Sequence, residues 1–293
     1  MDKLPLRLGL TMWSNNHWQQ AFYGSGTQAS QRLEKYANVF HTVEGNTTFY
    51  ATPTPSTVSN WKAATHDDFR FTFKLPKAIT HQHQLQSCQA LLADFMRIMA
   101  PLIPRIGQWT IQLPAAFGPE HFSQLTSFCA MLPPDFPIGV EVRHPAFFAK
   151  GDVEKRLNQW LLERNYDRII MDSRPVFSTQ PDSRSPFFAA LIDAQEKKPR
   201  VPVHAIATGA HPMVRFIGHP DEPLNDGFFT PWLDKLPQWI GEGKQPYLMI
   251  HTADNLVAPE LAAKLYRRLQ QQVSLPDLAP FPSQGDHAQI SMF

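Results

Sequence analysis

The stretch Gly139-Val140-Glu141-Val142-Arg143-His144 alternates apolar and charged side chains with a period of two. This alternation is typical of a β-strand, because successive side chains of a strand point to opposite faces. Val140 and Val142 therefore share one face, and Glu141 and Arg143 share the other. A strand of this kind needs an apolar layer on one side and a polar environment on the other.

Seven further stretches show a strand pattern. The clearest is Phe69-Arg70-Phe71-Thr72-Phe73-Lys74, which places three phenylalanines on one face and three polar residues on the other. The eight predicted strands begin near residues 7, 42, 69, 109, 138, 168, 213 and 247, about 27 to 45 residues apart. One strand and one helix fit into each interval.

Amphipathic helix patterns separate these strands. Leu33, Tyr36, Ala37 and Phe40 follow the i, i+3, i+4, i+7 spacing of a helix, and Thr54-Pro55 provides an N-cap and a first helical residue. Similar patterns cover residues 88–99, 122–132, 153–161, 232–240 and 261–269. Residues 173–212 lack a regular pattern, which predicts a long loop with a helical piece and a short extra strand over 203–207.

Eight strand–helix units in about 250 residues predict a TIM-type (β/α)8 barrel of the α/β class. A doubly wound open sheet is the alternative, but Thr11-Met12-Trp13-Ser14 after the first strand is unlike its Gly-rich phosphate turn. We expect one domain over residues 1–274. The tail over 275–293, Pro-rich and then polar, is expected to be poorly ordered.

Composition excludes some classes of protein and names no partner. The 293 residues are 43% hydrophobic, and 27 Lys and Arg face 26 Asp and Glu, so there is no net basic field for nucleic acid. Cys88 and Cys129 fall in apolar helix patterns, which favours reduced packing residues. Neither a signal peptide nor 18 consecutive apolar residues is present, so a cytoplasmic protein without a membrane partner is expected.

The polar faces of the predicted strands converge on one end of the barrel. Apolar faces must cover the helices, so the opposite faces line the interior, and the polar residues fall near the C-terminal ends of their strands, where TIM barrels carry their chemistry. Burying an unpaired charge costs several kcal/mol, so these groups should pair, hold water or bind a ligand. They are Glu44, Thr72, Lys74, Thr110, Gln112, Glu141, Arg143, Asp172, Arg215 and His251.

The residue types point to acid–base chemistry on a small anionic ligand. Lys74, Arg143 and Arg215 suit a phosphate or carboxylate group, and the carboxylates Glu44, Glu141 and Asp172 are candidates for proton transfer in a hydrolase or lyase-type enzyme. A Walker A motif, a G-x-S-x-G motif and a Cys–His nucleophile are all absent.

Each of these residues also has a purely structural interpretation. Glu141 and Arg143 can form a structural ion pair, Lys74 can be a solvated strand end, Asp172 can start a turn, and His251 can be a hydrogen-bonded packing residue. The coincidence of several such positions at one barrel end is what favours a ligand-binding mouth.

Two other partners stay open at this stage. The carboxylates and histidines are ligand types for a divalent metal, but cations in the same ring disfavour it, and no cofactor motif is evident. A nucleic-acid-binding or nuclease-like barrel is a second interpretation, and a non-catalytic ligand-binding protein is a third.

Aromatic residues after the first two strands can stack a base or a sugar or simply pack loops onto the barrel. They are Trp13, Trp18, Phe22, Tyr23, Phe49 and Tyr50. The oligomeric state is not predicted.

Several motifs resemble one protein family. They are Val43-Glu44-Gly45-Asn46-Thr47-Thr48-Phe49-Tyr50, Pro53, Trp61, Asp68-Phe69-Arg70-Phe71, Lys74-Leu75-Pro76, Ile79-Thr80-His81, Gln112-Leu113-Pro114 and Val140-Glu141-Val142-Arg143-His144. Over about residues 7–270 the chain is similar to the YecE-like family, catalogued as domain of unknown function 72. The resemblance implies a TIM barrel and no reaction, because the family is named for lacking one. A relationship to barrel endonucleases, with a nucleic-acid ligand, is an analogy only.

The resemblance adds residues to the predicted site. Asn46 and His81 match the family motifs and join Lys74, Gln112, Arg143, Arg215 and His251 as predicted substrate-binding residues, beside the predicted catalytic Glu44, Glu141 and Asp172. Many family members carry His-Gly after the seventh strand and Asn after the eighth. The corresponding places here read Ile217-Gly218 and His251-Thr252, closer to the YecE branch, so roles assigned to those family positions do not carry over.

Overall fold

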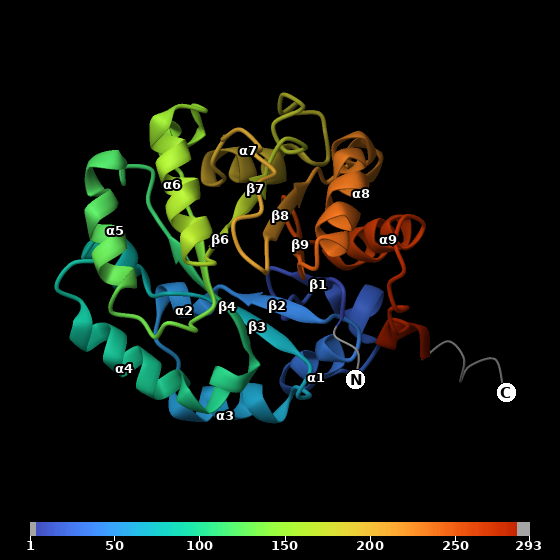
Figure 1. The fold of residues 1–293 in the computed structure, drawn as a ribbon. Coiled ribbons are helices and arrows are strands. Elements are labelled where there is room, and N and C mark those ends of the chain that lie inside the picture. The colour runs from blue at the N-terminus through green and yellow to red at the C-terminus, as the bar shows by residue number, and fades with distance from the viewer. Residues whose placement is uncertain (1–3, 286–293) are drawn as a thin grey trace, which may run out of the picture.

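Parallel strands arranged around one axis form the centre of the molecule, with helices outside them (Figure 1). The computed structural model describes residues 4–285. All strand pairs are parallel, in the order β6-β5-β4-β3-β2-β1-β9-β8-β7. The strands are β1 (Arg7–Leu10), β2 (Thr42–Gly45), β3 (Arg70–Lys74), β4 (Ile106–Gln112), β5 (Ile138–Glu141), β6 (Asp167–Arg168), β7 (Ile170–Asp172), β8 (Met213–Gly218) and β9 (Tyr247–Thr252).

The ring closes through the two shortest strands. β6 pairs with β5, and β7 pairs with β8, yet only Ile169 separates β6 from β7 in the chain. The Ile169 amide donates to the Val140 carbonyl at 2.9 Å, so pairing with β5 continues across the break. β6 and β7 therefore occupy one position of the ring, and the predicted TIM-type (β/α)8 barrel is confirmed with an interrupted sixth strand.

The helices form the outer layer, and most begin and end close to the predicted residues. In α3, Pro55 is the first helical residue and the Thr54 hydroxyl accepts a hydrogen bond from the Thr57 amide at 3.2 Å, as the N-cap prediction requires. No helix among residues 4–285 is both long and apolar enough to cross a membrane. The α-helices are α1 (Arg32–Ala37), α2 (Thr47–Tyr50), α3 (Pro55–Ala63), α4 (Gln89–Met99), α5 (Phe122–Cys129), α6 (Asp152–Glu163), α7 (Phe188–Lys197), α8 (Asn225–Gly241) and α9 (Ala258–Gln270).

The outward faces of the strands supply the main core between sheet and helices. Phe71 and Phe73 of β3 stack with ring centroids 5.2 Å apart, and both are fully buried. Val140 of β5 joins the same core cluster. This confirms the predicted orientation, because the polar residues that alternate with these side chains must then face the barrel interior.

The barrel interior contains a separate apolar cluster at mid-height. It consists of Ile169, Met213, Tyr247 and Met249, which do not join the main core. Met213 and Met249 lie two residues before Arg215 and His251 on the same strands, so they share the inward face with those polar residues. The cluster therefore divides the interior into an upper part at the C-terminal ends of the strands and a lower part at their N-terminal ends.

Residues 203–207 do not form the extra strand that the sequence predicts. Within residues 4–285 this segment takes part in no strand pairing. Side chains hold the segment instead: the His204 imidazole contacts Glu154 of α6 at 2.5 Å. The predicted helical piece of the long loop is present as α7.

The first part of the tail packs on the barrel. The Phe281 ring contacts the buried Phe22 ring edge-on at a centroid distance of 4.9 Å, and Leu278 packs on the main core. The prediction of poor order is therefore wrong for residues 275–285, because these apolar side chains cover core residues. Residues 286–293 lie outside the part of the chain that the structure describes.

Gly9 of β1 provides a test of the close approach between β1 and β2. A Cβ atom at this position would lie 2.1 Å from the Thr42 carbonyl oxygen, which is backbone and cannot move without disturbing the strand pair. We expect Gly9→Ala to lower the free energy of unfolding in urea by about 1–3 kcal/mol or more. Gly227→Ala in α8, where nothing lies within 4 Å, is the control and should leave stability equal or higher by up to about 1 kcal/mol. Equal stabilities of the two variants would contradict the close approach.

Candidate functional site

A cavity of about 800 Å³ opens at the C-terminal end of the barrel. We call it the mouth. Its wall is built from the ends of the strands and the segments that follow them, so the polar side chains predicted from separate strands do converge. Eight of the ten predicted site residues line the mouth: Glu44, Asn46, Lys74, His81, Gln112, Arg143, Arg215 and His251.

Arg215 of β8 joins the two glutamates of the site. Its Nη2 atom lies 3.0 Å from Glu44 Oε2, and its Nη1 atom lies 3.0 Å from Glu141 Oε2. All three side chains are at least nine-tenths buried. A buried arginine between two carboxylates satisfies charges that each would be costly to bury alone.

Three further groups complete this ion network. Arg143 donates from Nε to Glu141 Oε1 at 2.8 Å and contacts the same oxygen through Nη2 at 2.6 Å. Lys74 Nζ lies 3.7 Å from Glu44 Oε1. Asn46 donates through Nδ2 to the Thr11 carbonyl at 2.9 Å and to Glu44 Oε2 at 3.3 Å, which ties the segment after β1 to β2.

The pKa values of both carboxylates and of the lysine are lowered in the network, which favours ionised carboxylates and a neutral lysine. Burial alone would raise the pKa of Glu141, but Arg143, Arg215 and Lys74 outweigh it and lower that pKa to about 2. Against the same burial effect, Arg215 and Lys74 lower the pKa of Glu44. Burial, reinforced by repulsion from Arg215, lowers the pKa of Lys74 to about 8 despite the attraction of the glutamates.

Positive charge dominates the mouth. Its wall carries Lys74, Lys77, Arg143, Lys197, Lys198 and Arg215, whereas its carboxylates are Glu44 and, behind Arg143, Glu141. Lys197 also pairs with Asp193. Burial and repulsion from Arg215 and Lys74 lower the pKa of Lys198 to about 8. The excess of cations makes the mouth attractive to an anion.

Some buried polar atoms of the mouth lack a hydrogen-bond partner within residues 4–285. These atoms are Glu44 Oε1, Gln112 Oε1 and Arg215 Nε. Most buried polar groups of folded proteins are hydrogen-bonded, and exceptions require an explanation. A ligand or bound water in the mouth would supply partners for them.

The two histidines of the mouth favour their neutral form. His251 Nδ1 lies 2.7 Å from the Thr11 hydroxyl; burial, together with Lys198, Arg215 and Lys74, holds its pKa well below the usual value. His81 Nδ1 lies 2.9 Å from the Thr80 hydroxyl, and burial lowers its pKa as well. Neutral imidazoles can donate or accept a hydrogen bond without adding charge.

The comparison with known proteins settles the family. The model of the family described as "Protein of unknown function DUF72" matches residues 7–285. The chain belongs to the DUF72 family. The UPF0759 protein YecE of Escherichia coli strain K12 is 46% identical over 276 residues, 94% of this chain and 96% of that protein, and its counterpart in strain O157:H7 is equally similar. The family resemblance of the motifs is thereby confirmed.

Solved structures share the fold of this DUF72 protein. A DUF72 family protein from Enterococcus faecalis V583 superimposes with a TM-score of 0.70 at 20% identity, over 94% of this chain and 98% of that one. A DUF72 family protein from Thermotoga maritima MSB8 gives a TM-score of 0.66 at 19% identity, over 90% and 99% of the two chains. These likenesses support the barrel and carry no statement about chemistry.

Asp172 does not belong to the mouth of this DUF72 protein, and its predicted position there is wrong. Met171 lines the mouth instead, in register with Arg215, so Asp172 faces outward beside Phe216. The Asp172 carboxylate accepts a hydrogen bond from Trp232 Nε1 of α8 at 2.8 Å. Residues 168–172 show no apolar–polar alternation, so local pattern does not indicate which face Asp172 occupies.

Several residues of the mouth escaped the sequence analysis. Lys197 and Lys198 reach it from the end of α7, and Lys77 reaches it from the segment after β3. In sequence they look like ordinary solvated charges of a loop, and only the placement of α7 over the mouth distinguishes them. Residue type and spacing provide no signal for this.

The aromatic residues after the first two strands divide into two groups. Trp18, Phe22 and Tyr23 are fully buried core residues, so the packing interpretation holds for them. Trp13, Phe49 and Tyr50 line the mouth, and Tyr50 is 79% exposed. The second group can offer ring faces or edges to a ligand.

The titratable groups of the mouth do not form an evident metal centre. Within residues 4–285 no group of three or more His, Cys, Asp or Glu side chains could hold a metal ion. Glu44 and Glu141 already face cations. The donor set therefore fits an anion better than a metal.

Substituting Asp172 tests whether this residue is structural. Its carboxylate pairs with Arg174, with Nη2–Oδ2 at 2.7 Å, and is fully buried. We expect Asp172→Ala to lower the free energy of unfolding by about 3 kcal/mol and to leave anion binding in the mouth unchanged. Asp182→Ala is the matched control, because Asp182 and Arg184 repeat the same local pair at the surface, and its urea midpoint should match the wild type. If folded Asp172→Ala lost anion binding, the prediction that Asp172 belongs to the site would stand.

The low pKa of Glu141 predicts a defined loss of stability in acid. Between pH 4.5 and about 2 the unfolded chain binds a proton at this residue and the folded chain does not, so stability falls as pH falls. The advantage of the wild type over Glu141→Gln in urea unfolding should therefore shrink by up to about 3 kcal/mol across this window. Glu163→Gln on α6 should follow the wild-type curve at every pH. A constant difference between wild type and Glu141→Gln would contradict the ion network.

Proposed function

We propose that this DUF72 protein is an enzyme that binds a small phosphate- or carboxylate-bearing substrate in the mouth and moves a proton on it. The observation that carries the proposal is the convergence of cations from several elements on one cavity that also contains buried polar atoms without partners. Cavities with a few converging polar groups and shifted pKa values are the usual sites of ligand binding and catalysis.

In this proposal the anion is bound by the cations that keep free hydrogen-bond donors. Arg215 Nε is buried and unpaired within the described residues, although both Nη atoms are fixed by glutamates. Lys198 approaches from α7 on the other side of the mouth. Guanidinium groups held in place by carboxylates lose little freedom when they bind an oxyanion. Glu44 and Glu141 in this proposal position the arginines.

In this proposal Lys74 is the group that transfers the proton. A general base works best when its pKa is near the operating pH, and the pKa of Lys74 is about 8. Glu44 and Glu141 are held ionised by the same cations, so at neutral pH they have no proton to donate, and Glu141 with a pKa of about 2 is a weak base. The catalytic role that residue type suggests for the glutamates therefore passes to the lysine beside them.

The shape of the mouth favours a small ligand. It is a concave cavity of about 800 Å³, and Met171 contributes an apolar part of its wall. Tyr50 and Trp13 on its wall leave room for a ring on the substrate. A nucleic acid would need a continuous basic track along the surface. The cations of the mouth gather instead around one cavity.

Lys198 is the position that best tests the anion. Lys198 is partly buried and no hydrogen bond to its ammonium group is present among residues 4–285, so Lys198→Gln should leave thermal stability equal or higher. We expect the variant to weaken binding of inorganic phosphate to the mouth about tenfold in isothermal titration at constant ionic strength. Lys155→Gln on the exposed face of α6 should bind like the wild type. Equal phosphate affinity of Lys198→Gln and wild type would contradict anion binding at this place.

Turnover separates an enzyme from a binding protein with the same mouth. We would incubate the protein in ²H₂O with a panel of sugar phosphates and small carboxylic acids and follow proton exchange and product formation by ¹H NMR. Exchange that is lost in Lys74→Met and kept in Lys155→Gln supports proton transfer by Lys74. Phosphate binding without exchange or product on any member of the panel would leave a ligand-binding protein.

A further inference from the structure

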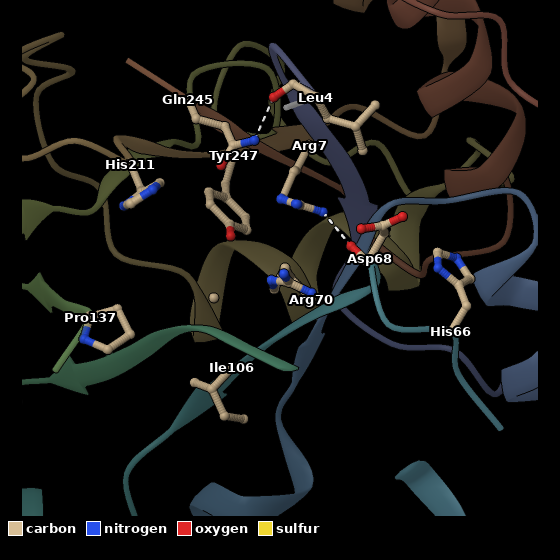
Figure 2. Close-up of a pocket in the computed structure, with 11 residues that line it drawn as sticks. Leu4, Arg7, His66, Asp68, Arg70, Ile106, Pro137, His211, Gln245 and Tyr247 are labelled. Carbon is tan, nitrogen blue, oxygen red and sulfur yellow. Dashed lines mark hydrogen bonds between the residues drawn. The ribbon is translucent and has the colours of Figure 1, made fainter. Parts of the chain in front are cut away.

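A second cavity, of about 610 Å³, opens at the N-terminal end of the barrel, opposite the mouth (Figure 2). Its residues come from the starts of the strands or from just before them, among them Arg7 of β1, Arg70 of β3, Gly107 of β4 and Tyr247 of β9. The apolar cluster at mid-height lies between this cavity and the mouth. The two cavities are therefore separate sites, and no role proposed for the mouth explains the lower one.

Arg7 places a buried charge at this cavity without a carboxylate partner. Its side chain donates from Nη1 to the Asp68 backbone carbonyl at 2.8 Å, and the residue is only 6% exposed. Within residues 4–285 its Nε atom has no hydrogen-bond partner and no carboxylate lies within 4.0 Å of its guanidinium. Figure 2 shows the guanidinium directed between Tyr247 and Asp68. A buried cation in this state is costly unless a ligand or water compensates it.

Two more donors face the same space. Arg70 donates from Nη1 to the carbonyls of Asp67 and Phe69, and in the described residues no carboxylate pairs with it. The Tyr247 hydroxyl points into the cavity (Figure 2), and the described residues provide no hydrogen bond for it. A Cβ atom at position 107 would lie 2.2 Å from the Tyr247 hydroxyl oxygen, so Gly107 is what leaves room for this hydroxyl.

The negative groups nearby leave the donors in excess. Asp68 lines the cavity but is exposed to solvent. Asp167 accepts hydrogen bonds from Gln108 Nε2 and from the His211 amide, both at 3.0 Å, and burial raises its pKa to about 7. Neither carboxylate forms an ion pair with Arg7 or Arg70 among the described residues. Burial, reinforced by repulsion from Arg70, lowers the pKa of Arg7 although Asp68 attracts it from a distance.

We infer that the N-terminal cavity is an oxyanion-binding site, in which Arg7, Arg70 and the Tyr247 hydroxyl hold a phosphate-type group. The two guanidinium groups are pure hydrogen-bond donors at neutral pH, and the phenol hydroxyl can donate as well, which matches the acceptor oxygens of phosphate. The cavity is larger than one phosphate, so the group can be free inorganic phosphate or the end of a phosphate ester. The site is independent of the proposed chemistry in the mouth.

Isothermal titration of the full chain with inorganic phosphate at constant ionic strength tests the inference. Wild type should show two classes of site, and Arg70→Gln should weaken one of them about tenfold while the other is kept. Arg97→Gln is the matched control, because it removes one arginine charge from an exposed position of α4, and it should bind like the wild type. A folded Arg70→Gln with unchanged phosphate binding would overturn the N-terminal site.

Two further variants and a competing ligand show which site and which kind of ligand are involved. Tyr247→Phe removes only the hydroxyl and should weaken the same class of site several-fold, so it decides the question if Arg70→Gln fails to fold. Lys198→Gln reports on the mouth alone, which makes failure of one site distinguishable from failure of the other. Phenyl phosphate that displaces inorganic phosphate from the Arg70-dependent site indicates an ester ligand, binding of inorganic phosphate alone indicates the free ion, and binding of neither contradicts the inference.

Discussion

The mouth of this barrel depends on one arginine held between two buried carboxylates. Arg215 bridges Glu44 and Glu141, each at 3.0 Å, and thereby ties β8 to β2 and β5 across the interior of the ring. Together with Arg143 beside Glu141 and Lys74 near Glu44, it keeps both buried glutamates ionised against the effect of burial. Burial lowers the pKa of Lys74, and repulsion from Arg215 lowers it further, although Glu44 and Glu141 lie close by. The protonation of the whole site follows from this contact.

This arrangement reverses the roles that residue type alone suggests. Carboxylates are the common acid–base groups of enzymes, and lysines at strand ends are commonly solvated. Here Arg215 and Arg143 pair with the carboxylates and hold the pKa of Glu141 at about 2, whereas the pKa of the buried Lys74 falls to about 8. Compensation of charge, rather than the intrinsic chemistry of a side chain, decides which group is free to exchange a proton.

The barrel interior is polar at both ends and apolar between them. Ile169, Met213, Tyr247 and Met249 form the apolar cluster of the interior, and no described residue lines both the mouth and the N-terminal cavity. At the upper end the glutamates balance part of the positive charge. At the lower end Arg7 has no such partner among the described residues. The two ends of one scaffold therefore present different electrostatic environments.

Periodicity along the chain is enough to predict the barrel, the starts of its strands and most residues of the mouth. Alternation in stretches such as Phe69–Lys74 fixes which side chains face the helices, and parallel strands then bring every polar C-terminal end to the same edge. This is why Glu44, Lys74, Glu141, Arg143 and Arg215 could be grouped without coordinates.

Other placements depend on contacts that periodicity does not encode. Asp172 follows a stretch without alternation, so its outward direction depends on the break at Ile169 and on the contact with Trp232. Lys198 reaches the mouth only because α7 folds over it, and Arg7 becomes a buried charge only because the ring closes around it. Such placements arise from contacts between segments distant in the chain, and local sequence patterns carry no information about those contacts.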